Sequence, residues 1–172
     1  MEGKTVRIMF VCLGNICRSP LAEAVFRHHV EKSGLGECFE IASSGTGHWH
    51  VGYGADDRMC KTARGFGVSL DSHRAQQFDY THFEEFDHIF VMDKSNLNDV
   101  LYLDRKEKFS GKVRLFREFD PHPGDYQVPD PYFGGPQGFS EVYDIVDRTS
   151  RRILELLAVE HQLDSSRQSD AA

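Results

Sequence analysis

Long hydrophobic runs and paired cysteines are both missing from the sequence, and each absence excludes a class of protein. No apolar stretch approaches the roughly 20 residues that a membrane-spanning helix needs. The apolar run Thr5–Val11 is too short, and wrongly flanked, for a signal peptide. Four cysteines in 172 residues, none in a Cys-x-x-Cys pair, do not make a disulfide scaffold. We therefore expect a reduced, cytoplasmic protein.

Positive charge is also scarce. Lysines and arginines number 20 against 27 aspartates and glutamates, which gives a formal net charge of −7. That sign argues against a nucleic-acid binder and against a membrane-surface binder. The composition, 40% hydrophobic and 27% charged, is typical of a globular protein, and the length suits one domain. We expect a monomer with a domain over residues 1–160 and a frayed polar tail over residues 161–172.

Short apolar segments alternate with segments of helical periodicity along the chain. Strands are predicted over residues 5–11, 39–43, 88–92 and 113–116. Helices are predicted over residues 20–32, 56–66, 94–105 and 139–157, with a mixed segment at 78–86 and a long irregular loop at 121–136. This alternation predicts an α/β fold, a single-domain three-layer sandwich in which helices cover both faces of a parallel sheet.

Polar residues follow three of the predicted strands. Cys12, Ser43 and Asp93 each lie at or just past the end of a strand. In a parallel sheet the carboxyl ends of the strands share one edge, and ligands bind beyond that edge. We therefore expect these three side chains to face one site.

The segment after the first strand has the properties of a phosphate-binding loop. Ser19 and Pro20 predict the start of a helix, with serine as its cap and proline as its first residue. Backbone amides of a tight loop and of a helix's first turn can converge on one anion, and Arg18 can bind phosphate oxygens in pairs. The same positive field favours the thiolate form of Cys12, which is a nucleophile, and Ser19 could donate its hydroxyl to that sulfur. The predicted phosphate-binding residues are Leu13, Gly14, Asn15, Ile16, Cys17, Arg18 and Ser19.

The Cys-x5-Arg spacing alone leaves another interpretation open. Cys12 could be a small buried residue at a strand end, and Arg18 could be a surface charge. The strand before the motif, the glycine inside it and the Ser-Pro step after it favour the phosphate site.

Val11–Pro20, VCLGNICRSP, resembles the phosphate-binding loop of the low-molecular-weight protein tyrosine phosphatases. Further segments resemble that family's motifs in the family's order: Ser43-Ser44-Gly45-Thr46 with Trp49, His73–Gln77, Met92–Leu97 and Asp130–Gly134. The resemblance spans about residues 6–157 and implies a flavodoxin-like four-stranded sheet of order 2-1-3-4. It also implies hydrolysis of phosphotyrosine in proteins and of small aryl phosphates, without a metal or cofactor and with inorganic phosphate as product and inhibitor.

The resemblance implies a covalent mechanism with three catalytic residues. Cys12 attacks phosphorus, Arg18 and the loop amides hold the phosphate oxygens, and Asp130 protonates the leaving oxygen and then activates water. On the residues alone, Asp120 and Asp125 compete with Asp130 as the acid. Prolines on both sides of Asp130 restrict its backbone, and its D-P-Y-x-G match favours it.

Supporting residues and pocket walls also follow from the resemblance. Asn15, Ser43 and His73 resemble a network beneath the loop, although His73 alone could be an ordinary hydrogen-bonded histidine. Asp93 supports the site and, as the residue before a helix, is also a candidate cap.

Aromatic side chains are expected to bind the substrate ring. Trp49 and Tyr132 resemble the family's two aromatic walls, and Ile16 and Phe133 complete the predicted pocket. Phe133 stands where many relatives carry a second tyrosine, so regulation by phosphorylation at that position does not carry over to this chain.

Three other functions compete with the phosphotyrosine phosphatase. An arsenate reductase needs further cysteines in the second half of the chain, and no cysteine follows Cys60. Relatives that act on phosphoarginine carry threonine where this chain has Ile16, whose apolar side chain suits an aryl group better. A non-catalytic phosphate-binding module is expected to lack Cys12 or Asp130, and both are present.

Cys17 lies five residues from Cys12 in the same loop. The loop and the resemblance together predict a reversible Cys12–Cys17 disulfide under peroxide, which protects Cys12 from over-oxidation. Alternatively, Cys17 is a small buried residue that has no redox role.

Overall fold

The computed structural model describes residues 3–165 and contains one parallel sheet at its centre. Its strands are β1 (Val6–Cys12), β2 (Phe39–Gly45), β3 (His88–Val91) and β4 (Val113–Leu115). All pairings are parallel, and the strand order is β2-β1-β3-β4. The predicted α/β class and the order 2-1-3-4 are thus confirmed.

Strand β1 lies between two neighbours and is apolar on both faces. Ile8 and Phe10 belong to the core on one side of the sheet, and Met9 and Val11 belong to the core on the other side. This alternation places successive side chains on opposite faces, as the pleat requires. A strand buried on both sides explains why the segment carries an almost unbroken apolar run.

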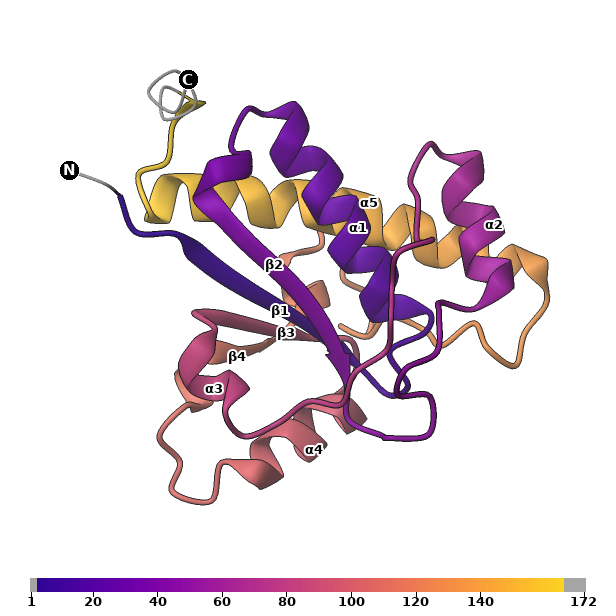
Figure 1. Cartoon of the computed structure of the whole chain (residues 1–172), viewed down its shortest axis with the longest axis horizontal. Coiled ribbons are helices and arrows are strands. Elements are labelled where there is room, and N and C mark those ends of the chain that lie inside the picture. Colours follow the sequence, from indigo (N-terminus) through magenta and orange to yellow (C-terminus); the bar gives the residue numbers. More distant parts are fainter. Residues whose placement is uncertain (1–2, 166–172) are drawn as a thin grey trace.

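Helices cover both faces of the sheet (Figure 1). Helices α1 (Arg18–Lys32) and α5 (Pro136–Glu160) pack side by side over one face, with α2 (Asp57–Gly65) against α5. Helices α3 (His82–Glu85) and α4 (Lys94–Leu103) lie on the other face (Figure 1). Short 3-10 turns are found at Gly36–Cys38, Ser110–Lys112 and Phe116–Phe119.

The start of α1 differs from the prediction. The helix begins at Arg18 and follows Cys17, whose side chain makes no capping hydrogen bond. Ser19 is therefore not the cap, and its hydroxyl turns to the Cys12 sulfur instead. The other end is as predicted: Gly34 adopts a φ of +73°, and the Leu35 amide donates to Val30, which closes the helix.

The last helix is longer than predicted. Helix α5 begins at Pro136 instead of residue 139, with proline at its first position. Beyond α5, the Leu163 amide donates to the Ala158 carbonyl, and the Leu163 side chain packs against the core. Residues 166–172, most of the predicted tail, lie outside the described residues. Among the described helices, none is both long and apolar enough to cross a membrane.

Candidate active site

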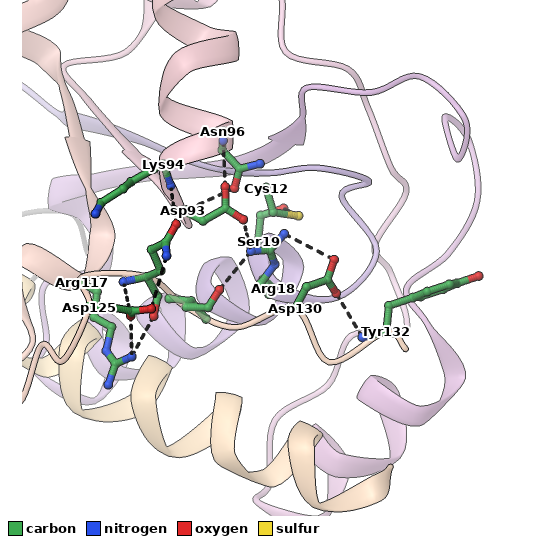
Figure 2. Close-up of polar contacts among 12 residues, drawn as sticks. Cys12, Arg18, Ser19, Asp93, Lys94, Asn96, Arg117, Asp125, Asp130 and Tyr132 are labelled. Atoms are coloured by element: carbon green, nitrogen blue, oxygen red, sulfur yellow. Dashed lines mark hydrogen bonds and ion pairs between the residues drawn. The ribbon is translucent and has the colours of Figure 1, made fainter. Parts of the chain in front are cut away.

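A pocket opens at the carboxyl end of the sheet, over the loop that joins β1 to α1 (Figure 2). The predicted Cys12, Arg18 and Asp130 all line it, although they come from segments far apart in the sequence. The remaining lining residues are Leu13, Gly14, Ile16, Cys17, Trp49, His50, Tyr132 and Phe133. His50 is the one residue of this lining that the sequence did not predict.

Two polar groups approach the Cys12 sulfur. The Ser19 hydroxyl lies 3.0 Å from Sγ, and the Asn15 backbone amide donates to Sγ over 3.3 Å. Cys12 is only 3% exposed, so its side chain is largely shielded from bulk water. Hydrogen-bond donors at this position stabilise a negative charge on sulfur.

Four carbonyls of the loop point away from the pocket. The Cys12 and Leu13 carbonyls accept hydrogen bonds from the Thr46 and Gly47 amides (2.9 and 2.8 Å), and the Ile16 carbonyl accepts from the Asp56 amide (2.8 Å). The Asn15 carbonyl contacts His73. In a trans peptide the next N–H points opposite to the carbonyl. The amides of Leu13, Gly14, Ile16 and Cys17 therefore face the other way, as an anion-binding cradle requires.

Asn15 holds this loop in an unusual backbone conformation. Its φ is +57°, a left-handed value that asparagine tolerates better than most residues. Its side-chain amide donates to the hydroxyls of Ser19 (2.7 Å) and Ser43 (3.0 Å), and its Oδ1 accepts from the Gln76 amide (2.9 Å). The backbone carbonyl oxygen of Asn15 lies 2.6 Å from His73 Nε2. Because a carbonyl oxygen can only accept a hydrogen bond, His73 carries a proton on Nε2.

The network extends to residues that the sequence did not predict. Ser43 donates to Glu23 on α1 (2.8 Å), and the Gln76 side chain donates to the Ser43 carbonyl (2.9 Å). A side chain at Gly45 would come within 2.7 Å of the Leu13 carbonyl oxygen, so only glycine lets β2 approach the loop this closely. Gly45 and Gln76 belong to segments that resemble the family's motifs, but nothing in the sequence pointed to Glu23.

Arg18 is buried and held from two sides. Its Nη1 donates to Asp93 Oδ2 over 2.7 Å and to the Val128 carbonyl over 3.0 Å. Burial alone would lower the pKa of Arg18, but the adjacent Cys12 and the hydrogen bond to Asp93 outweigh burial and raise that pKa. The guanidinium therefore keeps its charge although the side chain is only 3% exposed.

Asp130 lies at the mouth of the pocket, beside Arg18 (Figure 2). Its Oδ2 is 3.6 Å from Arg18 Nη2, and its Oδ1 accepts from the Tyr132 amide over 3.0 Å. The two competing carboxylates are held elsewhere. Asp125 lies 3.8 Å from Arg117, and Asp120 is buried between Arg117 and Arg148. Neither of them lines this pocket.

Aromatic side chains stand exposed around the pocket. Trp49 is 61% exposed, and its ring lies over Gly47, which leaves no room for a side chain there. Tyr132 and Phe133 are also exposed, and Figure 2 shows the Tyr132 ring directed outward. The Arg58 guanidinium lies 5.3 Å from the centre of the Tyr132 ring. These rings can bind an apolar, flat group that enters the pocket.

Cys17 and Cys12 line the same pocket as separate thiols. Burial, followed by the nearby Asp56 carboxylate, raises the pKa of the Cys17 thiol well above its usual range. Cys17 is therefore protonated where Cys12 has donors to stabilise an anion.

Known proteins match both the sequence and this fold. The family described as low molecular weight phosphotyrosine protein phosphatase matches residues 7–164. A low molecular weight protein-tyrosine-phosphatase of Streptomyces coelicolor is 45% identical over 162 residues, 93% of this chain and 97% of that protein.

Solved structures agree with this assignment. A protein tyrosine phosphatase of Entamoeba histolytica is 36% identical with a TM-score of 0.86, covering 92% of this chain and 100% of that one. A Drosophila arginine phosphatase is 30% identical with a TM-score of 0.81, covering 87% and 96%. Similarity of this extent confirms the resemblance seen in the sequence. The chain thus belongs to the low molecular weight phosphotyrosine protein phosphatases, a family of phosphoric monoester hydrolases.

Proposed function

We propose that the protein hydrolyses phosphotyrosine in protein substrates through a cysteinyl-phosphate intermediate, with Cys12 as the nucleophile. The observation that carries the proposal is the arrangement around the Cys12 sulfur. The loop carbonyls point outward, the Ser19 hydroxyl lies 3.0 Å from Sγ, and the Asn15 backbone amide donates to Sγ over 3.3 Å. Such surroundings favour a thiolate and place an anion-binding cradle next to it.

The first step transfers the phosphoryl group to sulfur. Cys12 Sγ attacks phosphorus, the bond between phosphorus and the phenolic oxygen breaks, and Asp130 gives its proton to that oxygen. The position of Asp130 at the pocket mouth, with a side chain 37% exposed, lets it reach a leaving group that points outward. A dianion bound beside this carboxyl favours its protonated form, as a general acid requires.

The second step hydrolyses the intermediate. Asp130 takes a proton from water, the water oxygen attacks phosphorus, and the sulfur–phosphorus bond breaks. Inorganic phosphate leaves, and the Ser19 hydroxyl donates to the released Cys12 thiolate. Because phosphate occupies the same cradle, we expect it to inhibit the enzyme competitively.

Arg18 and the loop amides supply the positive charge for both steps. The guanidinium is charged, and Asp93 and Val128 orient it toward the pocket. The loop amides and this guanidinium would hold the three equatorial oxygens of the transferring phosphoryl group. In other phosphoryl-transfer sites a metal ion supplies this charge. The reaction proposed here draws it from the chain's own groups.

The pocket lining supports an aryl phosphate as substrate. Trp49 and Tyr132 offer ring faces, and the half-buried Ile16 adds an apolar wall. Offset stacking of a phenyl ring is worth about 0.5–1.5 kcal/mol beyond its burial. Protein-arginine phosphatase is the second candidate, because the Drosophila arginine phosphatase shares this fold. The fold does not separate the two substrates, whereas an apolar residue at position 16 favours phosphotyrosine over a charged guanidinium.

Two measurements test the proposal. Wild-type protein should hydrolyse p-nitrophenyl phosphate in the presence of a metal chelator, and Cys12→Ser should lose turnover while phosphate still raises its melting temperature. Turnover that survives in Cys12→Ser refutes the cysteine mechanism. Two peptides of one sequence, carrying phosphotyrosine or phosphoarginine, should differ in kcat/KM by more than about tenfold in favour of phosphotyrosine. The reverse order makes the protein an arginine phosphatase.

A further inference from the structure

Three metal-ligating side chains meet where the sheet begins, at the end opposite to the phosphate loop. His88 is the first residue of β3, Glu160 is the last residue of α5, and His161 follows it. One ligand atom from each residue lies within 4.8 Å of the other two. The Nε2 atoms of the two histidines are 3.0 Å apart.

This separation is close to the one that a bound metal ion imposes. A zinc–nitrogen bond measures about 2.0–2.1 Å, so two imidazoles on a tetrahedral ion have nitrogens about 3.3 Å apart. At a right-angled octahedral position the separation is about 2.9 Å. The two nitrogens share a hydrogen bond in this structure, so an ion would replace its proton: the rings would turn to aim both lone pairs at the ion, while the nitrogen–nitrogen separation would change by only a few tenths of an ångström.

The surroundings hold the two rings in place. The His88 ring lies parallel to the Phe90 ring, with centroids 6.1 Å apart and an interplanar angle of 8°. The His161 ring lies at an interplanar angle of 84° to the His88 ring, with ring centroids 5.3 Å apart. Both imidazoles are half-buried, so part of their side-chain entropy is already lost before an ion binds.

Charge at the site is also compatible with a cation. Glu160 is exposed, and one of its carboxylate oxygens lies within 4.8 Å of a ring nitrogen of each histidine. Arg114, the cation near His88, forms an ion pair with Glu118 over 2.8 Å. The positive charge of Arg114 is therefore already compensated.

We propose that His88, Glu160 and His161 form a binding site for a divalent transition metal of the zinc class. Two imidazoles and one carboxylate suit Zn²⁺, Co²⁺, Ni²⁺ and Cu²⁺, whereas Mg²⁺ and Ca²⁺ prefer oxygen ligands. The site lies five residues before Asp93, roughly 16 Å of extended strand away, so the ion takes no part in phosphoryl transfer. It joins the start of β3 to the end of α5 and so fastens the segment after α5 to the sheet.

Cobalt titration of the full-length protein tests the site, because Co²⁺ reports its ligands through visible absorption. We expect one Co²⁺ per chain, with a spectrum that Zn²⁺ abolishes, and no strong thiolate band in the near ultraviolet. His161→Ala and His88→Gln should weaken binding by more than about tenfold. His122→Ala, which removes an exposed histidine outside the cluster, should bind like the wild type. Cys12→Ser should also bind normally, since the catalytic thiol is the other expected metal ligand.

A second measurement checks that lost metal binding in His161→Ala does not come from misfolding of the variant. His161→Ala should keep wild-type turnover of p-nitrophenyl phosphate in metal-free buffer, and Zn²⁺ should raise the melting temperature of Cys12→Ser but not of Cys12→Ser combined with His161→Ala. The proposal fails if Co²⁺ does not bind, if binding survives in His161→Ala, or if it disappears in Cys12→Ser.

Discussion

Asp93 holds Arg18 with one carboxylate oxygen and caps helix α4 with the other. Oδ2 accepts from Arg18 over 2.7 Å, while Oδ1 accepts from the Asn96 amide over 2.8 Å. The Asp93 backbone amide in turn donates to Asn96 Oδ1 over 3.2 Å, which completes a capping box. One carboxylate thus connects the start of α1, directly after the loop that follows β1, to helix α4 on the opposite face of the sheet (Figure 2).

Two substitutions at Asp93 separate these roles. Asparagine can still cap α4 with its single oxygen, but it removes the charge that orients Arg18, and alanine removes both. Both variants should lower kcat/KM for an aryl phosphate by about tenfold or more. Asp93→Ala should also lower the free energy of unfolding by about 1 kcal/mol more than Asp93→Asn. Equal urea midpoints for the two variants would show that the cap contributes nothing.

Asn15 combines three side-chain hydrogen bonds with a left-handed backbone, and substitution can distinguish the two contributions. Asn15→Ala loses the hydrogen bonds and keeps the strain, whereas Asn15→Gly adopts positive φ freely. We expect Asn15→Ala to lose about 3 kcal/mol of unfolding free energy and Asn15→Gly about 1 kcal/mol less. Urea unfolding measures both. Glycine as damaging as alanine would mean that the conformation at residue 15 is not strained.

The position of the site followed from the sequence because the topology determines it. Parallel strands place their carboxyl ends on one edge, so Cys12, Ser43 and Asp93 could be expected near one another before any side chain was located. Of the three, Cys12 lines the pocket, whereas Ser43 and Asp93 reach it only through Asn15 and Arg18. The identity of the hydrogen-bond partners did not follow in the same way. Gln76 reaches Asn15 across 61 residues of sequence, and Glu23 reaches Ser43 from a neighbouring helix. Such pairs depend on how separate elements pack, which local patterns do not encode.

Local sequence signals mispredicted the start of a helix where two interactions competed for one residue. Ser19 has the sequence context of a helix cap, but its hydroxyl is bound to Cys12, Asn15 and the Ser44 carbonyl. Hydrogen bonds to other segments thus override the capping preference at this position. Pro136 also suited a helix start, yet the prolines and glycines before it predicted a loop through that residue.

The proposed role of Asp130 predicts an effect specific to its proton. Asp130→Asn should lower kcat for a phosphotyrosine peptide by about 100-fold or more, since the amide cannot protonate the leaving oxygen. The loss should be smaller for p-nitrophenyl phosphate, whose leaving group needs less protonation. Asp125→Asn, at an exposed carboxyl in the same loop, should behave like the wild type. An equal loss for both substrates would argue against proton donation by Asp130.

Asp120 predicts how stability depends on pH. Burial alone would raise its pKa, but hydrogen bonds from Arg148, the His122 amide and Arg117 outweigh burial and hold the pKa below its usual value. The stabilisation is therefore present above the unfolded-state pKa, about 3.9, and is lost as pH falls through the lower folded-state value. Asp120→Asn should cost about 3–5 kcal/mol at pH 7 and flatten the loss of stability below about pH 4. Urea unfolding from pH 7 to pH 3 measures both, and an unchanged slope in the variant would contradict the assignment.

Treatment with peroxide tests the predicted disulfide between Cys12 and Cys17. Under the proposed mechanism peroxide oxidises the Cys12 thiolate to a sulfenic acid, releasing water or hydroxide. The Cys17 sulfur can then attack the Cys12 sulfur and release a second water as the disulfide forms. Because burial raises the pKa of Cys17, disulfide formation should speed up as pH rises.

After peroxide and then dithiothreitol, wild-type protein should regain most of its turnover, whereas Cys17→Ser should stay inactive because Cys12 oxidises further. Cys60→Ser, which alters a half-buried thiol outside the pocket, should recover like the wild type. Mass spectrometry should find a Cys12–Cys17 disulfide in the first case and a sulfinic or sulfonic Cys12 in the second. Full recovery of Cys17→Ser would mean that Cys17 does not protect the nucleophile and that its burial beside Cys12 serves packing alone.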